Sequence, residues 1–174
     1  AIAILWVNMI MDGPPAMALG VDRADGDAMS HAPRPGDERI LTRSRWTAVL
    51  LSSSVMALGT LAVLRWAPGA GLEADVPSIA GTMGFHTFVM FQFFNILSAR
   101  HDTRSVFHRD TFTNRWLWIS LAGVAVLQAT VSHVGAMREL FDTVAISGTQ
   151  WLVCVLVAAS VLLVEEARKL IIRT

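Results

Sequence analysis

Two polar side chains, those of Asn8 and Asp12, stand inside an apolar stretch that covers residues 1–21, in which Asp12 is the only charged residue. Their spacing of four residues places both side chains on one face of a helix, about one turn apart. A carboxylate and an amide oxygen are hard donors of the kind that Ca²⁺ and Mn²⁺ accept as ligands. Ionisable residues at membrane depth are costly, and they mark functional sites by default. The pair therefore predicts a cation site with Asn8 and Asp12 as metal ligands.

The three residues after Asp12, Gly-Pro-Pro, should break this helix. Proline has no backbone N–H, and its ring clashes with the carbonyl four residues earlier, so Pro14 disturbs the carbonyl of Ile10. Pro15 does the same to Met11. Carbonyls freed in a bilayer are tolerated only where protein, water or an ion satisfies them, which favours an ion site in a broken transmembrane helix. Two structural interpretations stay open, namely interhelical hydrogen bonds by the two polar side chains and a buried carboxyl that stays protonated.

Gln92 and Asn95 are weaker candidates for the same site. They lie three residues apart in another apolar stretch, so they share a helix face and offer two more amide oxygens. Structural hydrogen bonds to neighbouring helices explain the two amides more readily than direct ligation does. We predict no catalytic and no cofactor-binding residue in the chain.

Long apolar stretches must position these residues. Hydrophobic residues make up 53% of the 174-residue chain, its mean hydropathy is +0.51, and its formal net charge is zero. The neutral balance gives no electrostatic basis for nucleic-acid binding. A helix needs about 20 apolar residues to cross a hydrocarbon core of about 30 Å. We therefore expect an all-α membrane protein, a bundle of five transmembrane helices with spans at about 1–21, 46–64, 76–99, 116–134 and 143–164.

The basic residues indicate the orientation of the spans. Lys and Arg gather in loops 22–45 and 100–115 and after the last span, where the residues from Glu165 to Lys169 should open a short charged tail. Because cytoplasmic loops carry the excess of Lys and Arg, we expect both loops and the C-terminus in the cytosol. The expectation is an integral, multi-pass protein of a bacterial cell membrane.

Two motifs resemble one family of ion pumps. Residues 5–16, LWVNMIMDGPPA, resemble the sixth transmembrane helix of P-type cation-transporting ATPases, and are most similar to the secretory-pathway Ca²⁺/Mn²⁺ pumps and their bacterial relatives. Residues 87–100, TFVMFQFFNILSAR, and residues 105–107, SVF, resemble the eighth helix and the loop after it. The resemblance implies that residues 1–174 form the C-terminal transmembrane domain of such a pump, with helices six to ten.

The resemblance also implies a function. The chain would be the C-terminal membrane part of an ATP-driven divalent cation pump that transports Ca²⁺ or Mn²⁺. ATP and Mg²⁺ would act only through upstream domains, because the phosphorylated Asp-Lys-Thr-Gly motif and a GxxxxGK[ST] motif are absent from this sequence. By itself the chain would not be catalytic. Its expected partners are the upstream helices and cytosolic domains of the same pump and the lipid bilayer.

One residue bears on the number of ions. Met11 stands where the two-site reticulum pumps of the family carry a threonine that supplies oxygen to an additional site. A soft thioether is a poor Ca²⁺ ligand, so the resemblance implies one ion per cycle. The remaining negative charge would come from a glutamate of the fourth helix. The alternative is a stand-alone five-span membrane protein that binds or regulates a partner without transport, and the upstream sequence would decide between the two.

Overall fold

The computed structural model describes residues 2–22, 42–70, 77–100 and 105–173, and within these residues every regular element is a helix. This confirms the all-α prediction. The elements are α1 (Ile2–Trp6), the π-helical segment η1 (Val7–Met11), α2 (Gly13–Gly20), α3 (Arg43–Trp66), α4 (Ile79–Ala99), the 3₁₀ turn η3 (Arg109–Phe112), α5 (Arg115–His133), α6 (Gly135–Phe141) and α7 (Gly148–Arg173).

Side-chain caps define where the long helices begin. Thr42, Ser78 and Asn114 precede α3, α4 and α5, and each accepts a hydrogen bond from the backbone N–H three residues later. Such caps satisfy one of the N–H groups that have no partner inside a helix, typically for about 1 kcal/mol. The starts of these three helices are therefore encoded locally.

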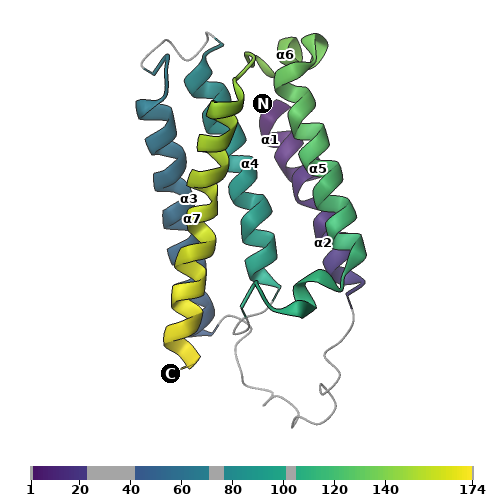
Figure 1. Ribbon diagram of the computed structural model, residues 1–174, viewed down its shortest axis with the longest axis vertical. Coiled ribbons are helices and arrows are strands. Elements are labelled where there is room, and N and C mark those ends of the chain that lie inside the picture. Colours follow the sequence, from purple (N-terminus) through teal and green to yellow (C-terminus); the bar gives the residue numbers. More distant parts are fainter. Residues whose placement is uncertain (1, 23–41, 71–76, 101–104, 174) are drawn as a thin grey trace.

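Helix α4 lies in the middle of the bundle, with α3 and α7 on one side (Figure 1). On its other side lie α5 and the consecutive elements α1, η1 and α2. Small residues let its neighbours approach closely. A Cβ atom on Gly59 of α3 would come within 3 Å of the Phe91 ring, and one on Gly84 of α4 would come as close to Leu64. Close backbone approach at small residues is typical of helix packing in membranes.

Four helical stretches are long and apolar enough to cross a membrane, namely Ile2–Gly20, Ser44–Trp66, Arg115–His133 and Gly148–Ile172. Five spans are not confirmed, because α4 is not among the four. His86, Gln92 and Asn95 lower its hydropathy. A helix enclosed by other helices has less need of apolar residues, since it faces protein where an outer helix faces lipid.

The charged residues near the C-terminus do not form the short tail that we expected. Helix α7 continues to Arg173, and Glu165 and Lys169 are 4% and 1% exposed. Ser52 Oγ donates to Glu165 Oε1 over 2.6 Å, and Lys169 Nζ donates to the Ser98 carbonyl over 2.9 Å. Buried charges are stable only when hydrogen bonds or opposite charges compensate their lost hydration, and these partners on α3 and α4 do so. Helix α7 also begins later than expected, at Gly148, after the short helix α6.

The helix ends that adjoin the two loops expected to be cytosolic gather at one end of the bundle. The end of α2, the start of α3, the end of α4, the start of α5 and the C-terminal end of α7 all lie there, while α6 lies at the opposite end (Figure 1). Val106 N donates to Glu166 Oε1 over 2.8 Å, which ties the segment after α4 to α7. Of the two loops expected to be cytosolic, residues 23–41 and 101–104 lie outside the described residues.

Candidate functional site

The helix that carries Asn8 and Asp12 changes its geometry at the predicted point. Asp12 N donates to the Val7 carbonyl over 3.1 Å, a hydrogen bond that spans five residues and closes a π-helical turn. A new α-helix begins at Gly13 with both prolines in its first turn, where a missing N–H costs nothing. The predicted break is confirmed, and it takes the form of a π-helical segment. Such segments are frequent at functional sites.

The two faces of this segment have different surroundings. Val7 and Met11 are 8% and 2% exposed and belong to the apolar core. Asn8 is exposed and Asp12 is partly exposed, so the carboxylate and the amide lie away from that core. Within the described residues neither side chain has a hydrogen bond or an ion pair. Asn8 lines an open groove of about 400 Å³ whose other walls include Phe85 and Phe88 of α4.

The weaker candidates are not part of this groove. Asn95 lines a separate pocket of about 290 Å³ between α3, α4 and α7, together with Ser52 and Glu165. Gln92 is partly exposed on α4. In the part of the chain that the structure describes, no three His, Cys, Asp or Glu side chains gather where they could hold a metal ion. The described residues thus bring together two candidate ligands, Asn8 and Asp12, which lie on the same short segment.

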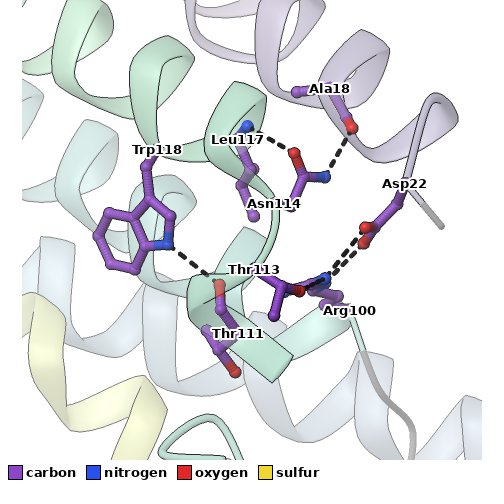
Figure 2. A network of polar contacts seen from close by, with 8 residues as sticks. All are labelled: Ala18, Asp22, Arg100, Thr111, Thr113, Asn114, Leu117 and Trp118. Atoms are coloured by element: carbon purple, nitrogen blue, oxygen red, sulfur yellow. Dashed lines mark hydrogen bonds and ion pairs between the residues drawn. The ribbon is translucent and has the colours of Figure 1, made fainter. Parts of the chain in front are cut away.

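A polar network holds the C-terminal end of α2, the helix that follows the π-helical segment (Figure 2). Arg100 makes a two-pronged ion pair with Asp22, from Nε to Oδ2 over 2.6 Å and from Nη2 to Oδ1 over 3.0 Å. Asn114 Nδ2 donates to the Ala18 carbonyl over 2.9 Å while its Oδ1 accepts from Leu117 N over 3.0 Å. Two-pronged arginine–carboxylate pairs fix geometry as well as adding energy. The end of α2 is therefore fixed to α4 and α5.

A tryptophan, Trp6, holds the other end of the π-helical segment, which it directly precedes. Trp6 Nε1 donates to Gln128 Oε1 on α5 over 3.1 Å, and its ring makes a T-shaped contact with the ring of Phe141 on α6, with 5.0 Å between centroids. Neither this contact nor the hydrogen bond from Asn114 to the Ala18 carbonyl was predicted from the sequence. An asparagine before an apolar run is a signal for a helix cap, but no local signal reveals that the same amide reaches Ala18.

A sequence model of one protein family, described as "Cation transporting ATPase, C-terminus", matches residues 1–171 of this chain. The chain belongs to this family of cation-transporting ATPases. The resemblance to P-type pumps found in the two sequence motifs is thereby confirmed, and it extends over almost the whole chain.

Curated relatives of this ATPase region are calcium-transporting ATPases. "Calcium-transporting ATPase 1" of Schizosaccharomyces pombe is 38% identical over 169 residues, which cover 97% of this chain and 18% of the relative. "Calcium-transporting ATPase type 2C member 2" of Mus musculus is 37% identical over 98% of this chain and 18% of its own length. "Calcium-transporting ATPase type 2C member 1" of Homo sapiens is 35% identical over 100% of this chain and 19% of its own length. The ATPase region described here thus spans about a fifth of the length of these relatives.

Proposed function

We propose that this chain supplies part of the intramembrane ion site of a complete ATP-driven Ca²⁺ pump, with the Asp12 carboxylate and the Asn8 amide oxygen as ligands. The observation that carries the proposal is the π-helical segment, which turns the two side chains away from the core formed by Val7 and Met11. A carboxylate that faces lipid is costly, so this open polar face requires protein, water or a cation. A cation held by oxygen donors meets that requirement.

The rest of the site comes, in this proposal, from upstream helices of the same pump. Asp12 contributes one negative charge, and a dication needs at least one more together with several neutral oxygens. A glutamate on the fourth helix, implied by the resemblance, would supply that charge. ATP and Mg²⁺ act through the upstream cytosolic domains, and motion there reaches the ion site through the membrane helices.

The names of the relatives favour Ca²⁺ as the transported ion and favour a pump over a stand-alone binding protein. The same donor set also accepts Mn²⁺, which prefers carboxylate and carbonyl oxygens. We propose a single ion per cycle, because the Met11 side chain belongs to the same buried apolar cluster as Val89 and Met90 of α4, at the place where a second ion would need oxygen.

We further propose that α4 crosses the membrane as the fifth span. It has 21 residues, which at about 1.5 Å per residue is long enough for a hydrocarbon core of about 30 Å. Its polar residue His86 is fully buried, so it faces protein. With five spans, loops 22–45 and 100–115 and the C-terminus lie on the cytosolic side, and the bacterial cell membrane stays our prediction for the location.

Replacing Asp12 by asparagine tests the proposal in the complete protein that contains this chain. Asp12→Asn keeps the shape of the side chain but removes the only formal charge of the segment. We expect the Ca²⁺ concentration for half-maximal phosphorylation by ATP to rise at least tenfold, which corresponds to about 1.4 kcal/mol of binding free energy. The measurement is Ca²⁺-dependent phosphorylation in membranes.

Asp142→Asn is the matched control. Asp142 is exposed and has a positive φ of 52°, a conformation that asparagine also adopts readily, so this change removes a carboxylate without disturbing the fold. We expect unchanged Ca²⁺ dependence for the control. An unchanged Ca²⁺ dependence in Asp12→Asn as well would remove Asp12 from the ion site.

A further inference from the structure

Gln128 is a buried polar residue of α5 that contacts the start of the candidate ion segment. None of its side chain is exposed, and its Oε1 accepts the hydrogen bond from Trp6 Nε1 over 3.1 Å. An indole nitrogen can only donate, so this bond fixes the amide with its oxygen toward the indole. With the edge contact to Phe141 at 5.0 Å, the Trp6 ring is held by α5 and by α6.

The position of Trp6 bears directly on Asp12. Trp6 is the last residue of α1, and the next residue, Val7, offers the carbonyl that accepts the Asp12 N–H over 3.1 Å. One peptide unit and one hydrogen bond thus connect the anchored tryptophan to the backbone of the carboxylate residue. Displacing Trp6 would displace the turn that ends at Asp12.

The anchor also sets the rotation of the segment about its axis. Val7 and Met11 pack into a core cluster that contains Val124, which precedes Gln128 by one turn on the same face of α5. The apolar contacts alone are non-directional. The hydrogen bond to Trp6 is directional, and it selects one rotation among those that the apolar packing allows.

Folding stability by itself does not favour a glutamine at position 128. Its Nε2 atom is buried and has no hydrogen-bond partner among the described residues. A buried donor without a partner is unfavourable relative to an apolar side chain of the same size. The benefit of the glutamine therefore lies in the acceptor that it presents to Trp6.

We propose that Gln128 is a positioning residue of the ion site, which holds Trp6 and thereby directs Asn8 and Asp12 toward the ion. The inference rests on the proposed function of Asn8 and Asp12, which it extends by a residue of another helix. Gln128 itself does not touch the ion.

A double-mutant cycle in the complete protein tests this positioning role. We expect Gln128→Met to raise the Ca²⁺ concentration for half-maximal phosphorylation about fivefold, the equivalent of about 1 kcal/mol for one hydrogen bond. The maximal phosphorylation level and the melting temperature should change little, because the variant removes one unpaired donor, Gln128 Nε2, and creates another, Trp6 Nε1. Trp6→Phe should give a similar shift, and the double variant should shift no further than either single variant.

Gln150→Met is the matched control, since Gln150 Oε1 also accepts one hydrogen bond, from Ser147 N over 2.7 Å, but at the start of α7. It should leave the Ca²⁺ dependence unchanged. Unchanged Ca²⁺ dependence in Gln128→Met, or shifts that add fully in the double variant, would overturn the inference. If Gln128→Met fails to fold, then Trp6→Phe decides by the same shift. A response in Asp12→Asn without one in Gln128→Met refutes the positioning role alone, whereas no response in Asp12→Asn refutes the proposed function.

Discussion

Met11 and Asp12 are neighbours in sequence that face different surroundings. Met11 is 2% exposed and contributes to the core, whereas Asp12 is partly exposed. Successive residues of a helix point in directions far apart around its axis, so the thioether and the carboxylate cannot serve the same face. A substitution at Met11 therefore acts on packing first, while one at Asp12 acts on charge.

We predict that Met11→Thr destabilises the protein without creating a second ion site. The shorter side chain leaves a cavity and brings a hydroxyl into an apolar core, for which we expect a loss of at least about 2 kcal/mol. Met11→Leu keeps the volume and should cost less than about 1.5 kcal/mol. Thermal unfolding of the complete protein and bound ⁴⁵Ca²⁺ per phosphorylated pump are the measurements. A stoichiometry near two in the unmodified protein would contradict the single-ion proposal.

Single residues show how much of the candidate site the sequence can predict. Asn8 and Asp12 stood out because an amide and a carboxylate are unusual in an apolar stretch and because the next residues are Gly-Pro-Pro. Gln128 did not stand out, since its partner is 122 residues away and one glutamine in a span has many structural explanations. The burial of Lys169 was missed for the same reason: its partner, Ser98, lies on another helix.

At the scale of the elements, α5 holds the helical stretch Ile2–Gly20, which carries Asn8 and Asp12, at two points. Gln128 binds the residue before the π-helical segment, and Asn114, directly before α5, binds the carbonyl of Ala18 near the end of α2. The apolar stretches predicted where most helices lie. They did not predict that α4 is the enclosed helix or that the charged end of α7 packs against it, because both follow from contacts between distant segments.

We predict that substitutions at Asn114 separate its two hydrogen bonds. Asn114→Ser keeps a good helix cap but is too short to reach Ala18, whereas Asn114→Ala loses the cap as well. Alanine should therefore destabilise the protein by about 1 kcal/mol more than serine does, and serine by about 1 kcal/mol relative to the unmodified protein. Ser78→Ala, which removes a cap only, is the control. Thermal unfolding measures these differences, and equal stability of Asn114→Ser and the unmodified protein would show that the bond to Ala18 contributes nothing.

At the scale of the whole molecule, the long helices run between two ends of the bundle, and different connecting segments lie at each end (Figure 1). Arg100 and its partner Asp22 lie at one end, and the start of α5 joins them there (Figure 2). Helix α6 and the turn after α3 lie at the other end. This arrangement accommodates the orientation predicted from Lys and Arg, in which the first of these ends faces the cytosol.

Cysteine labelling tests that orientation, with the region that carries only its buried native cysteine as the unlabelled control. The single cysteine of these 174 residues, Cys154, is fully buried, so this region should not react with a membrane-impermeant thiol reagent unless a cysteine is introduced. Glu139→Cys on α6 and Pro68→Cys after α3 should react in intact cells, because both positions are exposed at the end predicted to lie outside the cytosol. Phe107→Cys, at a side chain that is 72% exposed near the opposite end, should react only after the membrane is opened. If Phe107→Cys reacts in intact cells while Glu139→Cys is protected, the predicted orientation is wrong. The end of the bundle that carries Arg100 would then face away from the cytosol, the side on which ATP is used.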